Sequence, residues 1–461
     1  MNAETRPLRV AVVGSGPAGF YAAGALLAAD VAVEVDMIER LPTPWGLVRL
    51  GVAPDHENIK AVSRAFERIA AKPGFRFFGN VELGRDVEHG ELCDLYDGVV
   101  YTVGAQTDRR LDIPGEDLPG SWPATAFVAW YNAHPDFQDL SFDLSHERAV
   151  VVGNGNVAID CARMLALTRE ELASTDTTDA AAEAIVNSNI REIVMLGRRG
   201  PAQASFTPPE LQELGELGGA DVAVDPAELS LDAASEAALE ADRDRARRNV
   251  ELLREFATRA PTGKPRTLRL RFLVSPVAIL GEDRVEAVEV VHNELVADDR
   301  GRIVARPTNR REVIECGLVL RSVGYLGVEL PGLPFDDVRR VMPNEGGRVL
   351  GGDGQPMAGV YCAGWIKRGP TGVIGTNKKD ATETVELLLE DAGAGRIGAL
   401  PLEGTLESLL DGRGVEYVTY AAWEAIDSGE RARGEPLGRP RVKFLTWEEL
   451  LAAGRVGTKS S

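Results

Sequence analysis

The sequence predicts an α/β fold of two domains, each a doubly wound parallel sheet, with the second domain inserted into the first. One observation is a repeated unit: an apolar run, a glycine-rich turn, a small-residue helix and another apolar run begin near residue 10 and again near residue 148. A second observation is a pair of similar glycine-ended apolar runs far apart in the chain, Val99–Ala105 and Leu318–Tyr325. Strands that alternate with helices in this way form parallel sheets.

The first unit places a tight turn between a buried strand and a helix. The strand is Val10–Val13, and Gly14, Gly16 and Gly19 follow it at the spacing GxGxxG. The first glycine permits the turn, the second lets the backbone approach a pyrophosphate, and the third allows close helix packing. The second strand of the unit ends at Glu39, where a carboxylate can accept hydrogen bonds from a ribose. The unit therefore predicts a dinucleotide site.

The second unit carries the same turn with a small change. The strand Arg148–Val152 leads into Gly153, Gly155 and Ala158, at the spacing GxGxxA, and a helix then runs towards Leu167. Alanine at the third position packs slightly more loosely and is a usual variant of this turn. We therefore expect a second dinucleotide site.

The end of the next strand indicates which dinucleotide binds there. That strand is Glu192–Leu196, and Arg198 and Arg199 follow it where an acidic residue would favour NAD. Paired guanidinium groups give a 2′-phosphate charge-assisted contacts that a 2′-hydroxyl cannot match. A solvated arginine pair is the usual alternative, but the position at the strand end favours phosphate. The unit therefore predicts NADP.

The domain boundaries follow from the two glycine-ended strands, which mark the crossings between domains. We expect residues 1–106 and 327–461 to form the first domain and residues 107–326 to form the second. Within the second domain, the Ala/Glu/Asp/Arg-rich stretch Ala220–Arg259 is expected to form one long solvated helix.

Composition excludes several classes of protein. Apolar residues make up 44% of the chain of 461 residues, so wholesale disorder is excluded. The 51 basic and 71 acidic residues give a net charge of -20, which argues against nucleic-acid partners. The apolar stretch Ala18–Ala29 is shorter than the roughly 20 residues of a membrane span. The cysteines form no CxxC pair, so no metal site is expected and a cytoplasmic location fits: Cys93, Cys161, Cys316 and Cys362.

A third glycine-rich segment, Gly364–Lys379, returns the chain to the first domain before an amphipathic helix. A helix N-terminus there can direct backbone N–H groups at the pyrimidine edge of a flavin. Trp365 is expected either to form an aromatic wall beside that ring or to pack in the core.

Several sequence blocks together identify a family. Two are the most specific, because generic flavin disulfide reductases do not share them: LPTPWGLVRLGVAPDH at 41–56 and GWIKRGPTGVIGTNKKDA at 364–381. Others are VVGSGPAGFYAA, FRFFGNVELG, YTVGAQTDRRLDIPGEDLPG, VVGNGNVAIDCAR and GRRGPAQASFTPPEL. With these blocks the chain resembles the adrenodoxin-reductase type of ferredoxin–NADP reductase. Residues 168–190 and the last 60 match least clearly.

The resemblance implies an enzyme that passes a hydride from NADPH to FAD and then two single electrons to a ferredoxin. FAD would lie in the first domain and NADP in the inserted one. The residues that would contact FAD are Gly16, Pro17, Ala18, Glu39, Leu47, Leu83, Trp365, Gly372, Val373 and Ile374. The residues that would hold NADP are Arg110, Asn154, Asn156, Val157, Ala158, Arg198, Arg199 and Glu210, with Gly372 near the nicotinamide.

His56 is the histidine of greatest interest. It could pair with Glu213 or Glu210 near the flavin and move a proton linked to reduction, so His56 and Glu213 are the expected catalytic pair. The alternative is a histidine that caps a loop and does not titrate. No nucleophile is needed, because the flavin itself takes the hydride.

Ferredoxins are generally acidic, so this acidic chain should carry a local basic surface. One candidate is a helix face with Arg243, Arg247 and Arg254, and another is the group Arg306, Arg310 and Arg311. Acidic residues lie between the helix arginines, so a mixed solvated face is the alternative. Either surface would make ferredoxin reduction sensitive to salt.

Two other functions remain open at this point. A diaphorase or quinone-type reductase would pass electrons from the same flavin directly to a small acceptor. A non-catalytic redox sensor would bind both dinucleotides without turnover. Thioredoxin and glutathione reductases are disfavoured, because the chain lacks their CxxC or CxxxxC pair.

Overall fold

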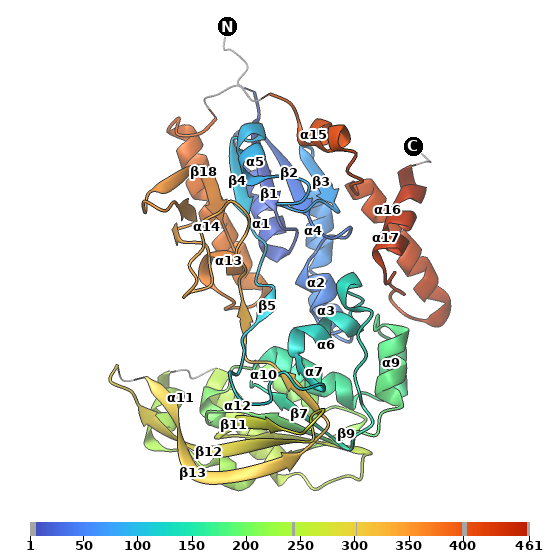
Figure 1. The fold of residues 1–461 in the computed structure, drawn as a ribbon, viewed down its shortest axis with the longest axis vertical. Coiled ribbons are helices and arrows are strands. Elements are labelled where there is room, and N and C mark those ends of the chain that lie inside the picture. The colour runs from blue at the N-terminus through green and yellow to red at the C-terminus, as the bar shows by residue number, and fades with distance from the viewer. Residues whose placement is uncertain (1–5, 242–244, 301, 399–402, 459–461) are drawn as a thin grey trace.

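The computed structural model describes residues 6–241, 245–300, 302–398 and 403–458. Two large sheets organise two domains, with the first domain above the second in the view of Figure 1. The predicted α/β architecture, with one domain inserted into the other, is confirmed. Among the described residues, no helix has both the length and the apolar character to cross a bilayer. All four cysteines are free, and only Cys93 is exposed.

The sheet of the first domain is parallel at its centre. Its strands are β1 (Leu8–Val13), β2 (Val33–Glu39), β3 (Phe75–Gly79), β4 (Gly98–Tyr101), β16 (Asn344–Glu345), β17 (Arg348–Leu350) and β18 (Pro356–Cys362). The order is β16-β17-β18-β4-β1-β2-β3, in which β18 to β3 are parallel. The edge strands β16 and β17 pair antiparallel, which the sequence did not predict. The central strands are apolar runs because both faces are covered.

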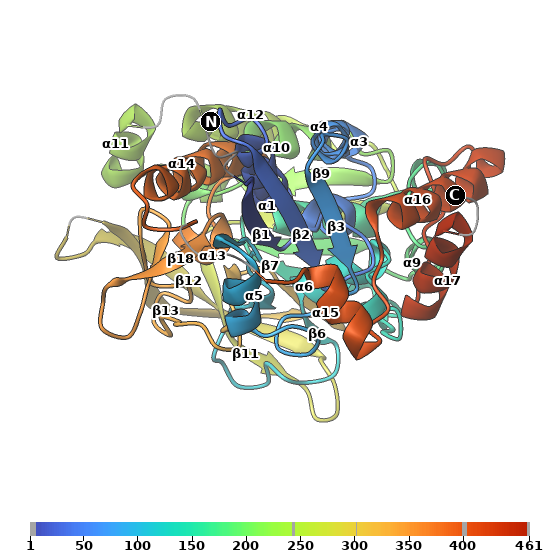
Figure 2. The same cartoon turned by 90° about the horizontal axis from the view of Figure 1, so that it is seen from above.

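Helices cover both faces of this first sheet, as Figure 2 shows from above. On one face lie α1 (Pro17–Leu26), α4 (Ser63–Ala70), α14 (Ile374–Gly393), α16 (Tyr420–Gly434) and α17 (Trp447–Thr458). On the other face lie α5 (His89–Leu95) and α15 (Leu406–Arg413). Three short helices complete the domain: α2 (Leu47–Leu50), α3 (Glu57–Lys60) and α13 (Trp365–Arg368).

The sheet of the second domain is parallel throughout. Its strands are β6 (Ser121–Pro123), β7 (Arg148–Val152), β8 (Glu192–Leu196), β9 (Ala220–Val224), β10 (Arg266–Arg271) and β14 (Leu318–Arg321). Their order is β6-β14-β7-β8-β10-β9. On one face pack α6 (Ala124–Tyr131), α7 (Asn156–Ala166), α8 (Arg169–Ala173), α9 (Asp179–Val186), α10 (Pro208–Leu214) and α12 (Arg245–Thr258).

The opposite face of the second sheet is covered by another sheet instead of helices. This three-stranded antiparallel sheet consists of β11 (Val274–Leu280), β12 (Ala287–Ala297) and β13 (Ile303–Glu315). Buried apolar side chains from β11, β12 and β13 pack there against β7, β8 and β14. The sequence analysis did not predict this layer.

The predicted single helix over Ala220–Arg259 is wrong. The segment begins with β9, which pairs in parallel with β10, and continues through a 3₁₀ turn at Pro226–Leu229. The helix α11 (Ala233–Ala241) and then α12 follow. The proline breaks the helical pattern, and Asp225 caps the turn by accepting a hydrogen bond from the Ala227 amide.

The two domains are joined by a short ribbon of two strands. β5 (Thr107–Asp108) pairs antiparallel with β15 (Tyr325–Leu326), so the chain enters and leaves the second domain side by side. Gly104 and Gly324, next to this ribbon, have positive φ angles of 77° and 112°. The remaining 3₁₀ turns are Pro135–Phe137, Pro201–Gln203 and Glu435–Leu437.

Candidate functional site

The first glycine turn forms an open cradle at the start of α1. Gly14 has a φ of 103°, and a side chain on Gly19 would collide with the Gly14 carbonyl. By contrast, no atom lies within 4 Å of the place where a side chain on Gly16 would begin. The turn is therefore crowded at Gly14 and Gly19 and open at Gly16, which leaves room for a pyrophosphate. Pro17 is the first residue of the helix that follows.

Glu39 lies at the carboxyl end of β2, beside this cradle. Its carboxylate accepts hydrogen bonds from the Ser15 amide at 3.0 Å and from the Ser15 hydroxyl at 2.7 Å. The Glu39 carbonyl accepts a bond from the Val81 amide, which brings the loop that contains Leu83 to the same strand end. The Glu39 carboxylate, which is predicted to bind a ribose, is thus held in place beside the turn.

The most specific sequence blocks also meet at the first cradle. A side chain on Gly46 would begin 3.0 Å from the Gly16 Cα, so the start of α2 and the exposed Leu47 lie against the turn. A side chain on Gly364 would begin 2.7 Å from the Ala18 Cβ, so Trp365 and α13 come to the same place. The start of α14 completes this end with Gly372, Val373 and Ile374, of which Val373 is 58% exposed.

The second turn repeats this geometry at the start of α7. A side chain on Gly153, whose φ is 146°, would collide with the Ser322 carbonyl, whereas the space over Gly155 is open. Ala158 is fully buried, and Val157 is partly buried against the core. The side chain of Asn154 packs directly on Gly197 at the end of β8.

Two asparagines tie this second turn to α10. The Asn154 carbonyl accepts hydrogen bonds from the Ser205 and Phe206 amides at 2.8 and 3.1 Å. The Asn156 side chain accepts one from the Thr207 amide at 2.9 Å, directly before α10. Since α10 carries Glu210 and Glu213, these bonds place both carboxylates next to the turn.

Among the buried side-chain atoms of the described residues that have no hydrogen-bond partner, three lie beside the cradles: Trp365 Nε1, Asn154 Oδ1 and Glu210 Oε2. A buried polar atom without a partner is costly, so each calls for a ligand or water. The first belongs to the C-terminal block beside the first cradle, and the other two lie beside the second. These atoms and the open space over Gly16 and Gly155 fit two bound dinucleotides.

The expected NADP residues occupy two different places. Arg198 and Arg199 follow β8 and line a pocket, with no carboxylate of the described residues within ion-pair distance. Arg110 lies close to the ribbon that joins the domains, 53% exposed, and its guanidinium pairs with Asp117 at 2.6 Å.

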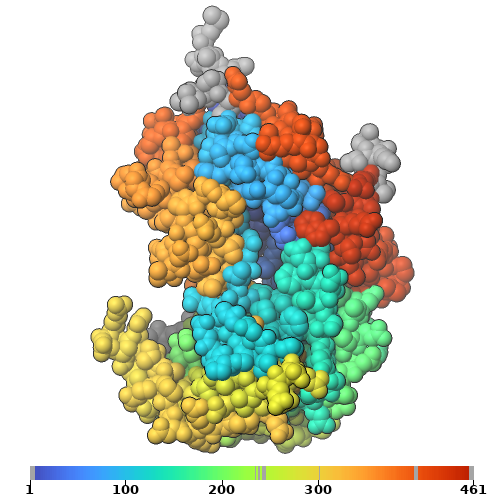
Figure 3. Space-filling model, in the orientation of Figure 1, coloured from blue at the N-terminus to red at the C-terminus, as the bar shows by residue number. Residues whose placement is uncertain are grey.

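His56 and Glu213 meet across the boundary between the domains. Figure 3 shows the surface hollowed between the two domains. His56 belongs to the first domain, is buried, and its Nε2 lies 2.6 Å from the Glu213 carboxylate of α10. Its side chain makes no capping bond to α3, so the loop-capping alternative does not describe it. The structure therefore brings the expected pair together.

A buried arginine that the sequence analysis missed lies at the centre of this contact. The Arg163 guanidinium, from α7, contacts His56 and donates to Glu213 at 2.5 Å. The same group donates to Asp160 at 2.8 Å and to Asp55 at 3.2 Å. Within the helix pattern Arg163 resembles any polar position, and only its place three residues after Asp160 hinted at a pair.

Burial and charge shift the titration of this cluster. Burial lowers the pKa of His56, but its hydrogen bond to Glu213 and the nearby Asp160 and Glu210 outweigh this and raise it. The bond to His56 lowers the pKa of Glu213. Burial raises the pKa of Asp160 to about 7 and also raises that of Glu210. The cluster can therefore hold and exchange a proton near neutral pH.

His56, Glu210 and Glu213 also have the donor types of a metal site, since one ligand atom of each lies within 4.8 Å of the others. The Arg163 guanidinium, however, contacts both His56 and Glu213 and supplies the positive charge at this place. This arrangement supports the expectation of no metal.

The candidate docking arginines are mostly paired with acidic residues. Arg247 lies 3.6 Å from Glu240, and Arg306 and Arg311 pair with Glu294 and Glu289. These pairs fit the mixed solvated face that was the alternative. Arg243 lies outside the described residues. Neither Arg254 nor Arg310 forms an ion pair with a described residue.

Comparisons with known proteins agree with this geometry. The family model described as pyridine nucleotide-disulphide oxidoreductase matches residues 8–196. The NADPH-ferredoxin reductase FprA of Mycobacterium tuberculosis is 51% identical over 460 residues, which cover 97% of this chain and 99% of that protein. The mitochondrial NADPH:adrenodoxin oxidoreductase of Arabidopsis thaliana is 42% identical over 467 residues, which cover 98% and 96%.

A solved structure of Mycobacterium tuberculosis FprA in complex with NADPH has the same fold. Its TM-score is 0.92 at 50% identity, and the match covers 98% of this chain and 100% of that chain. Identity of this level over the full length is far beyond what a shared fold alone would give. The chain belongs to the family of NADPH-ferredoxin reductases that includes the adrenodoxin reductases.

Proposed function

We propose that this protein transfers electrons from NADPH to a ferredoxin-type iron–sulfur protein through bound FAD. The observation that carries the proposal is the segment 46–56, which connects the two cradles. It starts against Gly16 of the first cradle and ends at His56, which contacts α7 and α10 of the second domain. One dinucleotide in each cradle would therefore meet its neighbour at the same interdomain hollow.

FAD belongs to residues 1–106 and 327–461 in this proposal, and NADP belongs to residues 107–326. Bound FAD supplies the redox chemistry, because its ring accepts a hydride from NADPH and releases electrons one at a time. Gly14, Gly16 and Gly19 admit its pyrophosphate, and Glu39 accepts from its ribose. The N-terminus of α1 directs unpaired N–H groups at the same phosphates.

The remaining proposed FAD contacts come from the sequence blocks that meet at the first cradle. The proposed NADP contacts come from the second domain. The FAD set is Pro17, Ala18, Leu47, Leu83, Trp365, Gly372, Val373 and Ile374. The NADP set is Arg110, Gly153, Asn154, Gly155, Asn156, Val157, Ala158, Arg198, Arg199 and Glu210.

His56 and Glu213 hold a proton at the meeting point, on or between His56 Nε2 and the Glu213 carboxylate. Arg163 bonds to both side chains and so fixes their orientation. We expect His56→Gln to slow reduction of the flavin by NADPH while the protein still binds FAD. If the rate of flavin reduction in a single turnover is unchanged in His56→Gln, His56 has no part in proton movement during this step.

Stopped-flow absorbance tests the whole proposal. The purified protein should be yellow, should bleach with NADPH much faster than with NADH, and should regain its colour when a ferredoxin is added. Rapid reoxidation by quinones or dyes but not by ferredoxin would favour the diaphorase alternative. A protein that binds NADPH without bleaching would be a sensor.

The partner and the location follow from the same proposal. An acidic ferredoxin would dock on the second domain near Arg247 or Arg310, although most of the neighbouring arginines are paired. The scarcity of cysteine in the chain supports a reducing cytoplasm as its location.

A further inference from the structure

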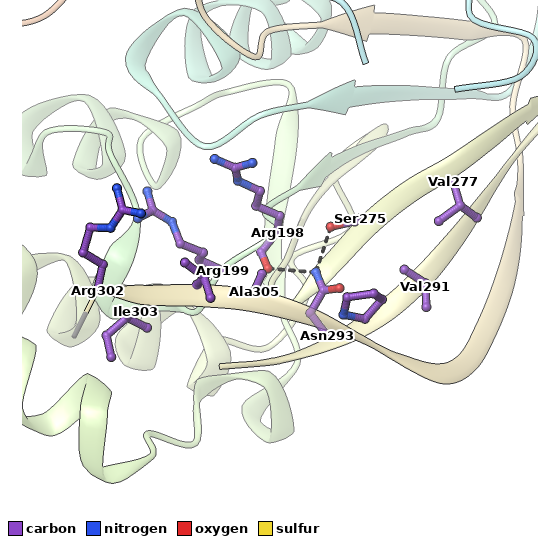
Figure 4. Close-up of a pocket in the computed structure, with 11 residues that line it drawn as sticks. Arg198, Arg199, Ser275, Val277, Val291, Asn293, Arg302, Ile303 and Ala305 are labelled. Atoms are coloured by element: carbon purple, nitrogen blue, oxygen red, sulfur yellow. Dashed lines mark hydrogen bonds between the residues drawn. The ribbon is translucent and has the colours of Figure 1, made fainter. Parts of the chain in front are cut away.

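The pocket beside Arg198 and Arg199 is built by two different sheets. Figure 4 shows the arginine pair at the end of β8 on one side and residues of β11, β12 and β13 on the other. The pocket has a volume of about 510 Å³, and apolar side chains line both of its ends, with Val277 and Val291 at one and Ile303 at the other beside Arg302. This size suits a small organic ligand with an apolar face.

Asn293 of β12 connects the antiparallel sheet to the arginine pair. Its side chain is buried, and its Nδ2 donates to the Arg198 carbonyl at 2.9 Å and to Ser275 Oγ at 2.8 Å, as the dashed lines of Figure 4 show. The pairing register between β12 and β13 shifts between Val291 and Asn293. Such a bulge commonly turns a side chain towards a functional site.

The backbone around Leu273 forms a second connection to the pair. The Leu273 amide donates to the Arg199 carbonyl at 3.1 Å, and its carbonyl accepts from the Asn293 amide at 2.7 Å. Leu273 has a φ of 56°, an uncommon conformation for leucine. Strain of this kind persists where the surroundings hold it, so the end of β8 is fixed from two sides.

The charged side chains that line the pocket are all arginines, and two of them, Arg198 and Arg199, form no ion pair with a described residue. Figure 4 shows the guanidinium groups of Arg198, Arg199 and Arg302 directed to the same side. Asp298 orients Arg302, with its Oδ2 2.7 Å from Nη2. Burial and the neighbouring Arg198 lower the pKa of Arg199. Three cations with one carboxylate between them favour a dianionic ligand such as a phosphate monoester.

We propose that the β11–β13 sheet completes the subsite for the 2′-phosphoadenosine end of NADPH. Asn293 is a positioning residue that fixes the Arg198–Arg199 backbone, and Arg302 is a third cation for the 2′-phosphate. The adenine lies against apolar side chains that line the pocket. This inference rests on the proposed function, because it assumes that NADPH is the electron donor.

Calorimetric titration of the FAD-loaded protein with 2′,5′-ADP and with 5′-AMP tests the inference. The variants are Asn293→Leu, which keeps the size but removes the donor, and Arg302→Gln. We expect each variant to bind 2′,5′-ADP about 5- to 10-fold more weakly, while its affinity for 5′-AMP changes by less than about 2-fold. Arg284→Gln is the matched control, since it removes an exposed arginine from the turn between β11 and β12, where it pairs with Asp143 and does not line the pocket.

A second readout separates positioning from general damage. In turnover with NADPH, both variants should raise KM while kcat changes little, and NADH turnover should stay the same. The inference is overturned if 2′,5′-ADP binds both variants as tightly as the parent protein. It is also overturned if the binding of 5′-AMP weakens as much as that of 2′,5′-ADP, because the lost affinity would then not depend on the 2′-phosphate. If NADPH fails to reduce the flavin of the parent protein, the proposed function itself fails.

Discussion

Replacement of Asp176 by asparagine should loosen the second domain from the first. Asp176 lies between α8 and α9 of the second domain, and its carboxylate binds two lysines of the first domain. The distances are 2.6 Å to Lys60 Nζ and 3.0 Å to Lys443 Nζ. Beside it, Arg439 donates to the Thr175 carbonyl at 2.8 Å. Figures 1 and 2 both show α16 and α17 next to α9 at this contact.

The expected cost follows from the burial of these charges. The side chains of Lys443, Asp176 and Lys60 are only 2%, 7% and 16% exposed. Removal of one partner from a buried ion pair costs about 3–5 kcal/mol, because it leaves the other charge uncompensated. A typical domain is stable by only about 5–15 kcal/mol, so Asp176→Asn should be severe. Misplacement of reacting groups by about 1 Å can slow a reaction 100-fold, so reduction by NADPH should slow strongly.

Urea unfolding of the FAD-loaded protein, followed by tryptophan fluorescence, measures the stability, and stopped-flow bleaching measures the rate. Asp179→Asn is the matched control, because Asp179 lies three residues further on, at the start of α9, and pairs with Arg439 of the first domain but is 77% exposed. The combined variant Lys60→Met, Asp176→Leu and Lys443→Met removes all three charges and should recover most of the stability. If Asp176→Asn destabilises no more than Asp179→Asn, the reasoning is wrong.

Four further outcomes test the site. Arg199→Gln should weaken NADPH binding roughly 10- to 100-fold in spectral titration and leave NADH unchanged, because it removes a charge-assisted bond to the phosphate. Gly19→Ala should lower the FAD content of the purified protein, since the new Cβ collides with the Gly14 carbonyl, whereas Gly90→Ala has free space and should keep FAD. Burial raises the pKa of Asp160 from 3.8 to about 7, so the stability from its protonated form is full below pH 3.8 and lost as pH rises to about 7. Asp160→Asn should flatten this loss in thermal unfolding between pH 4 and 8. Arg310→Glu should slow ferredoxin reduction at low salt but leave dye reduction unchanged.

The parts of the site that the sequence predicted depend on local constraints. The turns at Gly14 and Gly153 need glycine because of their positive φ angles and the backbone atoms close to them, and the short motif around each already indicates this. Glu39 and Arg198 were predicted because each stands at or directly after the end of a strand. The pairing of His56 with Glu213 spans 157 residues, and only the family resemblance suggested it. Local spacing alone carries no information about such a contact.

The parts that the sequence did not predict are those where charged residues become buried only in the assembled fold. Arg163, Lys443 and Asp176 read as ordinary solvated positions, yet each is almost fully buried against the other domain. Asp176 and Lys443 belong to residues 168–190 and to the last 60 residues, which resemble the family least clearly, whereas Arg163 ends the block VVGNGNVAIDCAR. Contacts between domains are set by complementary charge and shape over many positions, whereas a phosphate turn needs particular residues at fixed spacing. The weakest motifs in this chain therefore lie at the part of the interface formed by Asp176 and Lys443, whereas His56 and Arg163 come from recognisable family blocks.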